Sequence, residues 1–418
     1  MNDFKNILVN TRMKIYIVSK EPFPYGMAAT NRIICYAKAL KEANLPCEVL
    51  IFTRTEKAGT GIKNAFAGGV FEGITFKYIG GKSIRNKHVF IRKLLDLLDQ
   101  QKLIRYLKNN LKKGDVVFGY CGTHVNFINK VIDTAHKKDA IYIRELCELP
   151  YGTSQETPKS IKLRKQVLLK QFPKCDGFIA ISDSLVELAQ KYKSPKAQIL
   201  KIPILVDYDK YAISDISNKA EIPYIFHSGT LYEQKDGILG MIEAFGIASQ
   251  QLSFPIHFIL TGDKKESPHA TVIDELIIKY QLQDKIHFVG YLNEEKLREY
   301  LSLAALVIIN KYDTQQNKYC FSTKLAEYLA AGKPTIITDV GEAQKWLTNE
   351  ESAIIVKNGD IKILAEKITI LFSDEKFRKK LSSQGKKVCE QHFNYKHYGI
   401  ILKNYIESIY QTYKDEKK

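Results

Sequence analysis

The feature that most constrains this chain is an alternation of short apolar runs with helical patterns, which occurs twice in succession. The first series of runs, rich in β-branched residues, lies at Lys14 to Ser19, Glu48 to Thr53, Thr75 to Ile79, Val116 to Tyr120, Ile141 to Arg144 and Phe178 to Ile181. After a segment near residues 203 to 222 the second series follows, at Tyr224 to Ser228, Ile256 to Thr261, Ile286 to Val289, Ala305 to Asn310, Thr335 to Thr338 and Ala353 to Val356. Strands that alternate with helices build parallel sheets covered by helices on both faces. The sequence therefore predicts the α/β class, with two doubly wound, Rossmann-like domains.

The length of the chain agrees with two domains, because its 418 residues exceed the roughly 250 to 300 residues at which single cores stop growing. We expect an N-terminal domain at 1–205, a second domain at 206–395, and a C-terminal helix at 396–418 that packs back towards the N-terminal domain. Seven cysteines without a Cys-x-x-Cys pair indicate reduced thiols and a cytoplasmic protein. Apolar runs such as Leu303 to Ile309 fall far short of about 18 residues, so we expect neither a signal peptide nor a spanning helix.

The excess of basic over acidic residues is confined to the first half of the chain. Residues 1 to 205 hold 35 Lys and Arg against 17 Asp and Glu, whereas residues 206 to 418 hold 28 against 29. This asymmetry predicts that the N-terminal domain meets an anionic partner. The basic helical patterns at Arg92 to Lys113 and Lys159 to Phe172 could lie on an anionic membrane, although ordinary amphipathic surface helices look the same. Because no helix-turn-helix, RNP or zinc signature is present, we expect no nucleic-acid partner.

Loops that follow strands are the places to search for ligand-binding residues, because ligands bind at the carboxyl ends of the strands in doubly wound sheets. The loop after the first run contains Gly26 and leads into a helical pattern at Asn31 to Lys41. A glycine there lets backbone amides at a helix start approach a phosphate, although an ordinary strand-to-helix turn has the same sequence. The loop at 227 to 237 contains Gly229 and then Lys235, a possible cation for a diphosphate that could equally be a solvated lysine.

The stretch from Tyr319 to Pro334 carries the strongest signal. Ser322 or Thr323 is expected to cap a helix whose free amides could bind phosphate, with Lys324 adding positive charge at the same end. Glu327 lies one turn further along, where its carboxylate could accept both hydroxyls of a ribose. A capped surface helix with a Lys–Glu pair is the alternative interpretation.

These residues resemble the large retaining glycosyltransferase family four, the group 1 glycosyltransferases, over nearly the whole chain. The resemblance implies the GT-B architecture, in which two Rossmann-like domains face each other across an interdomain cleft. It assigns donor binding to Gly26, Gly229, Thr230, Lys235, Gly262, Ser322, Thr323, Lys324 and Glu327. The segment Arg144-Glu145-Leu146 is similar to one in members that build bacterial surface polysaccharides. The chain departs from the family where a first signature glutamate is replaced by Tyr319 and a loop arginine by Thr230.

For catalysis we expect Lys235 and Lys324 to stabilise the departing diphosphate. His124, and Glu145 or Glu148 after the next strand, are candidates for orienting the acceptor hydroxyl. The resemblance implies a UDP- or GDP-linked sugar donor with no metal or other cofactor. The segment Asp207-Tyr-Asp209 matches the metal-binding Asp-x-Asp pattern of a different, single-domain transferase fold, but it lies in the interdomain segment, away from a donor-side strand end.

The sequence therefore predicts an enzyme that transfers a sugar from a nucleotide sugar to a glycan or lipid-linked acceptor, in cell-surface polysaccharide or glycolipid synthesis. We expect it in the cytoplasm, with possible attachment to the inner face of the plasma membrane. A nucleotide-sugar epimerase of the same architecture is the enzymatic alternative, and a basic nucleic-acid-binding protein is the alternative of another class.

Overall fold

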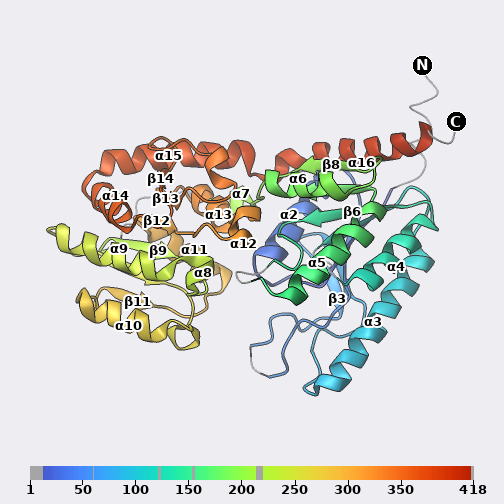
Figure 1. Ribbon diagram of the computed structural model, residues 1–418, viewed down its shortest axis with the longest axis horizontal. Helices are drawn as coiled ribbons and strands as arrows, with labels where there is room; N and C mark the ends of the chain where they lie inside the picture. The colour runs from blue at the N-terminus through green and yellow to red at the C-terminus, as the bar shows by residue number, and fades with distance from the viewer. Residues whose placement is uncertain (1–12, 60, 121–123, 153–155, 213–219, 416–418) are drawn as a thin grey trace. The chain divides into compact units, whose positions relative to one another are not determined.

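The computed structural model describes residues 13–59, 61–120, 124–152, 156–212 and 220–415 (Figure 1). The chain divides into two compact units, of which unit 1 comprises Met1–Pro203 with Tyr395–Lys418 and unit 2 comprises Ile204–Asn394. Each unit contains its own parallel sheet, which confirms the prediction of two successive α/β domains. Part of the predicted connecting segment, residues 213–219, lies outside the described residues.

Unit 1 is built on an eight-stranded sheet in the order β3-β4-β2-β1-β5-β6-β7-β8. Its strands are β1 (Ile15–Ser19), β2 (Cys47–Ile51), β3 (Gly68–Phe71), β4 (Ile74–Tyr78), β5 (Val116–Tyr120), β6 (Ile141–Leu146), β7 (Gly177–Ala180) and β8 (Gln198–Lys201). Neighbouring strands are parallel except for β3, which runs antiparallel to β4. The central strands β1 and β5 are buried along their whole length, as expected of parallel strands covered on both faces.

Most helices of unit 1 connect one strand of its sheet to the next along the chain, and the last helix comes from the C-terminal end. They are α2 (Ala28–Glu42), α3 (Val89–Asn110), α4 (Val125–His136), α5 (Pro158–Lys170), α6 (Asp183–Tyr192) and α16 (Tyr398–Asp415). The C-terminal helix α16 packs against α2. It also contacts strands β7 and β8. The buried Tyr405 hydroxyl accepts a hydrogen bond from the backbone N–H of Phe178 at 2.8 Å and donates one to the carbonyl of Gln198 at 2.9 Å.

Unit 2 is built on a six-stranded sheet in the order β11-β10-β9-β12-β13-β14, with all neighbours parallel. Its strands are β9 (Tyr224–His227), β10 (His257–Leu260), β11 (Ile286–Phe288), β12 (Leu306–Ile309), β13 (Thr335–Thr338) and β14 (Ile354–Val356). Its helices are α7 (Tyr208–Tyr211), α8 (Glu233–Asp236), α9 (Ile238–Gln251), α10 (Ala270–Lys279), α11 (Glu294–Leu303), α12 (Gln315–Tyr319), α13 (Thr323–Ala330), α14 (Ile361–Ser373) and α15 (Glu375–His392). Helices α9 and α14 pack together over the sheet, and their apolar faces form its core with the strands.

Each sheet has one point where the strand order reverses. In unit 1 it lies between β1 and β5, and in unit 2 between β9 and β12, because the connections on either side run in opposite directions. Crevices at such points, outside the carboxyl ends of the strands, are where open α/β sheets bind ligands. The loops after β9 and β12 in unit 2, and after β1 and β5 in unit 1, are therefore the parts of the fold to inspect.

Among the described residues, none of the helices combines the length and apolar character that crossing a bilayer requires.

Candidate functional site

The loop after β9 is held in shape by polar contacts at the switch point of unit 2. The hydroxyl of Thr261 accepts from the backbone N–H of Gly229 at 2.8 Å, and Asp236 Oδ2 accepts from both the N–H and the hydroxyl of Thr230 at 3.0 Å. Gly229 cannot be replaced without cost, because a Cβ there would lie 2.3 Å from His227 Nε2 and 2.9 Å from Asp236 Oδ2. The loop is thus a prearranged turn in which a glycine backbone lies beside a histidine and a carboxylate.

Lys324 and Asp236 form a largely buried ion pair that ties this loop to helix α13. Lys324 Nζ contacts Asp236 Oδ1, and the side chains are 19% and 2% exposed. Burial alone raises the pKa of the Asp236 carboxyl, but the charge of Lys324 and the hydrogen bonds from Thr230 outweigh burial and hold this pKa well below its usual range. The carboxylate therefore stays ionised, and it fixes the position of the lysine charge and of the loop together.

His227, the last residue of β9, is a neutral imidazole with one nitrogen available. Its Nδ1 donates to the carbonyl of Ile308 at 3.0 Å, which leaves Nε2 as a hydrogen-bond acceptor. Nε2 is buried and has no hydrogen-bond partner among the described residues. Burial, and then the charge of Lys324, lower the pKa of His227 from 6.5 to about 4.

This shift makes the stability of the protein depend on pH in a defined window. Because the unfolded imidazole binds a proton more readily than the folded one between pH 6.5 and about 4, the stabilisation is complete above pH 6.5 and falls as the pH drops towards 4. We expect a slope of up to about 1.4 kcal/mol per pH unit that is missing in His227→Asn. Urea unfolding at several pH values measures it, with the exposed His88→Asn as control. Equal slopes in wild type and His227→Asn would contradict the assignment.

A second partly buried lysine, Lys311, lies after β12, on the other side of the switch point. Lys311 Nζ donates to the backbone carbonyl of Lys235 and to Asn317 Oδ1, both at 3.3 Å. Burial, and then the charge of Lys324, lower the pKa of Lys311. The neighbouring Asn310 donates to the carbonyl of Gly237 at 2.8 Å, and no larger residue fits at Gly237, where a Cβ would lie 2.5 Å from Asn310 Nδ2.

Helix α13 begins where the sequence predicts. Ser322 occupies the N-cap position, but its side chain makes no capping hydrogen bond, so the amides of the first turn are not covered by it. Gly332, with φ +64°, follows the end of the helix as expected. Glu327 lies one turn after Lys324 on the same helix, and the adjacent buried Tyr328 hydroxyl accepts from the N–H of Ser228 at 2.8 Å. The structure therefore brings Gly229, Thr230, Ser322, Thr323 and Lys324 to one edge of the sheet.

The other predicted residues of unit 2 differ in setting. Gly262, with φ +94°, follows β10, and its N–H bonds the carbonyl of Gly290 at 2.8 Å. A Cβ on Gly262 would lie 3.2 Å from the carbonyl oxygen of Gly229, so this loop packs against the β9 loop. Lys235 lies in α8 with an exposed side chain, and only its backbone carbonyl joins the Lys311 contact.

The candidates in unit 1 separate into open and buried positions. Gly26 is exposed just before α2, and a Cβ there would collide with the Thr30 hydroxyl, which donates to the carbonyl of Pro22 at 2.7 Å. His124 is exposed at the N-cap of α4. Glu145 is instead 2% exposed in β6.

Glu145 belongs to a buried network that also explains the position of Arg32. Glu145 Oε1 accepts from Arg32 Nε at 2.7 Å and Oε2 accepts from the Tyr36 hydroxyl at 3.0 Å. Arg32 further donates to the carbonyls of Ile202 and Pro203. Both oxygens of the Glu145 carboxylate are therefore engaged away from solvent, whereas the other acceptor-side candidates, His124 and Glu148, are exposed.

Sequence reasoning missed three residues of the unit 2 site: Asp236, His227 and Lys311. Asp236 follows Lys235 directly, but its pairing with Lys324 across 88 residues leaves no local pattern. A polar residue at the end of an apolar strand was the one available signal for His227 and Lys311. Among the described residues, no three His, Cys, Asp or Glu side chains converge as metal ligands would.

Comparison with known proteins finds glycosyltransferases among the proteins that this chain resembles. Residues 210–388 match the family model described as "Glycosyl transferases group 1". An uncharacterized glycosyltransferase of Bacillus subtilis, YqgM, is 21% identical over 303 residues, 68% of this chain and 79% of that protein. The Staphylococcus aureus capsular polysaccharide biosynthesis glycosyltransferase CapM is 34% identical over 98 residues, 23% of this chain and 25% of that protein.

A solved structure resembles the whole fold. Anabaena HepE, in complex with UDP, has a TM-score of 0.67 at 13% identity and covers 95% of this chain and 100% of its own. This likeness and the two parallel-sheet units confirm the predicted GT-B fold.

Proposed function

We propose that this chain, which its family match and its relatives indicate to be a nucleotide-sugar-dependent glycosyltransferase, transfers a sugar, with retention, from a UDP- or GDP-linked donor to a glycan or lipid-linked acceptor. The product belongs to cell-surface polysaccharide or glycolipid synthesis. The similarity to a capsular polysaccharide glycosyltransferase supports this role, and the complex of a structural neighbour with UDP supports the donor class.

The observation that carries the proposal is the buried Lys324–Asp236 pair at the switch point of unit 2. During transfer, negative charge grows on the departing diphosphate, and preorganised cations and helix amides stabilise it most effectively. Lys324 is preorganised because Asp236 holds it, and the first turn of α13 adds uncapped amides. Lys311 and Lys235 contribute further positive charge, Glu327 accepts the ribose hydroxyls, and His227 Nε2 accepts one hydrogen bond from the donor.

Product analysis tests the proposed reaction. The protein is incubated with UDP- and GDP-linked sugars, with and without saccharide and glycolipid acceptors, and the anomeric configuration of the product is read by NMR. We expect acceptor-dependent transfer with retention. Conversion of the donor sugar to its epimer without an acceptor would instead identify an epimerase, and an inverted anomer would remove the assignment of retention.

We propose that lysines and helix amides do the work that a metal ion does in other transferases. Activity is then expected to change by less than about twofold when EDTA replaces added Mg²⁺ or Mn²⁺, because the stabilising cations belong to the chain. Loss of activity in EDTA that a divalent ion restores would contradict this part of the proposal.

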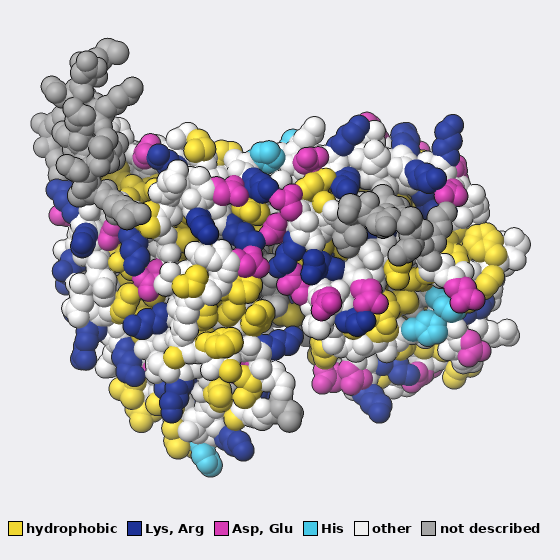
Figure 2. All heavy atoms as spheres, turned by 180° about the vertical axis from the view of Figure 1, so that it is seen from behind, with side chains coloured by type: hydrophobic (Ala, Val, Ile, Leu, Met, Phe, Trp, Pro, Cys, Tyr) yellow, Lys and Arg dark blue, Asp and Glu magenta, His cyan; other side chains and the backbone are white. Residues whose placement is uncertain are grey.

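We further propose that unit 1 attaches the enzyme to the inner face of the plasma membrane through the first ten residues of α3. None of residues 89–98 is buried, and six of them are exposed apolar side chains, from Val89 to Leu98. Exposed basic residues precede them at Lys82, Arg85 and Lys87 and lie among them at Lys93. Hydrophobic and basic side chains lie interspersed on the surface of unit 1 (left half of Figure 2). Such a surface suits an anionic bilayer, where each basic residue contributes about 1 kcal/mol.

The variant Phe90→Asp/Leu94→Asp tests the attachment, because these side chains are 87% and 58% exposed. We expect binding to vesicles containing phosphatidylglycerol to fall about tenfold or more, since burying one such side chain is worth about 1.5–3 kcal/mol. Flotation measures it, with Ile278→Asp on α10, which is 67% exposed, as the matched control. Equal flotation of the two variants, or equal binding of wild type to phosphatidylcholine alone, would contradict the attachment.

A further inference from the structure

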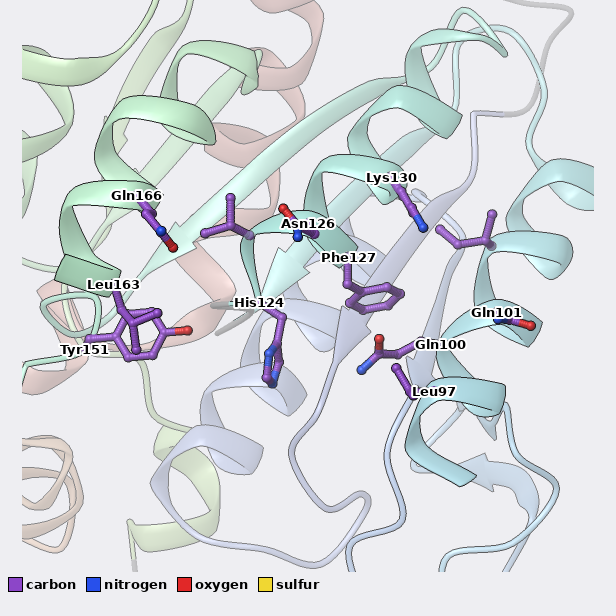
Figure 3. A pocket seen from close by; sticks show the side chains of 12 residues that line it. Leu97, Gln100, Gln101, His124, Asn126, Phe127, Lys130, Tyr151, Leu163 and Gln166 are labelled. Atoms are coloured by element: carbon purple, nitrogen blue, oxygen red, sulfur yellow. The ribbon is translucent and has the colours of Figure 1, made fainter. Parts of the chain in front are cut away.

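Unit 1 contains a cavity of about 370 Å³ bounded by α3, α4 and α5 (Figure 3). This volume lies in the lower part of the range of about 300 to 1,000 Å³ that small-molecule pockets occupy, so it suits a ligand of modest size. All of its lining residues belong to unit 1. It is distinct from the Lys324–Asp236 site, which lies in unit 2.

The lining of the cavity has an unusual chemistry. Four carboxamides line it, Gln100, Gln101, Asn126 and Gln166, together with one lysine, Lys130, and none of its lining residues is a carboxylate. Each carboxamide offers two N–H donors and a carbonyl acceptor, which suits ligand hydroxyls that both donate and accept. The aromatic rings of Phe127 and Tyr151 provide apolar faces beside these polar groups. This combination suits a ligand rich in hydroxyls better than it suits an acyl chain, and the single lysine can also donate hydrogen bonds to hydroxyl oxygens.

The position of the cavity also indicates a ligand site. His124 lines it and occupies the N-cap position of α4, the helix that follows β5 at the switch point of the unit 1 sheet. Tyr151 follows β6, the next strand of the sheet. The cavity therefore opens at the carboxyl ends of two neighbouring strands, where α/β sheets bind their ligands.

We propose that this cavity binds a neutral saccharide, the sugar end of the acceptor, through hydrogen bonds from its carboxamides. The inference rests on the proposed function, because an acceptor is required only if the enzyme transfers sugar. Leu97 both lines the cavity and belongs to the exposed apolar stretch of α3. An acceptor that carries a lipid can therefore extend from the cavity onto the surface that we assign to the membrane.

The variants Gln100→Leu and Gln166→Leu test the proposal, because each removes one carboxamide with little change in size on a different helix. The matched control is Gln190→Leu, an exposed glutamine on α6 of the same unit. The probes are methyl glycosides of glucose, galactose, mannose and N-acetylglucosamine, with octanol and inorganic phosphate as non-saccharide probes. Ligand-observed NMR on the full chain measures binding, and melting in UDP and GDP measures the donor site separately.

We expect at least one glycoside to bind, about tenfold more weakly to each cavity variant than to wild type or Gln190→Leu, because a lost hydrogen bond of about 1.4 kcal/mol is a factor of ten. The response to UDP or GDP should be equal in all four proteins. If no glycoside binds, if the cavity variants bind as wild type does, or if octanol or phosphate binds there instead, the inference is wrong. A normal nucleotide response alongside such a result would leave the proposed function standing, whereas loss of that response in wild type would remove the function itself.

Discussion

Replacing Lys324 with alanine lowers kcat by about 10²- to 10³-fold, the usual effect of removing one preorganised group that stabilises a developing anion. The reason lies in the contacts of Lys324, since Asp236 holds its ammonium group at the switch point of unit 2. Because the lysine side chain is already fixed, it loses little further conformational entropy when the diphosphate departs. Steady-state kinetics with a saturating donor measures the effect.

Two further variants separate chemistry from folding. Lys324→Ala leaves the buried Asp236 charge without its partner, which is itself destabilising. The double variant Lys324→Ala/Asp236→Ala removes both charges, so we expect it to recover stability but not kcat. Lys376→Ala, an exposed lysine at the start of α15, should behave as wild type. A kcat within about threefold of wild type in folded Lys324→Ala would end the assignment.

Replacing Arg32 with alanine destabilises the protein by about 3–5 kcal/mol, the expected effect of removing one partner of a buried ion pair. Arg32 and Glu145 side chains are 3% and 0% exposed, and their Nε and Oε1 atoms lie 2.7 Å apart. Without Arg32, the Glu145 carboxylate is stranded and the carbonyls of Ile202 and Pro203 lose their donor. Chemical unfolding measures the change in free energy.

The double variant Arg32→Met/Glu145→Leu decides the role of Glu145. Apolar replacement of a whole buried ion pair is often neutral, so most of the lost stability should return. If the setting of Glu145 is structural, kcat should remain near that of wild type. A fall of 10²-fold or more in a well-folded double variant would restore Glu145 as a catalytic residue, and a loss below about 1 kcal/mol in Arg32→Ala would contradict the account of the network.

Most of the fold follows from local patterns in the sequence. The twelve predicted runs all became strands, because buried parallel strands are continuous apolar segments. The strands β3 and β8 were missed for physical reasons. The strand β3 begins with two glycines and is largely exposed at the sheet edge, and β8 is a four-residue edge strand with no buried position. Neither carries the apolar signal that marks a central strand.

The site was only partly predictable, because part of it consists of pairings between distant residues. Gly229 and the start of α13 were found from turn and capping chemistry, which acts over a few residues. The partner of Lys324 was not found, since the local pattern offered Glu327 at three residues' distance and the structure pairs it with Asp236. Glu145 has the residue type and position of a catalytic acid, and only its burial against Arg32 separates it from that role.

The central claim is that the edge of unit 2 at Lys324, Gly229 and Glu327 binds a nucleoside diphosphate, and thermal unfolding with a nucleotide panel tests it most directly. A ligand at about 100 times its Kd adds roughly 2.7 kcal/mol. We predict that UDP or GDP, and the matching nucleotide sugars, raise the melting temperature while unrelated nucleotides do not, and that Glu327→Ala abolishes the shift. The absence of a shift with every nucleoside diphosphate in well-folded protein, or an undiminished shift in Glu327→Ala, would contradict the claim.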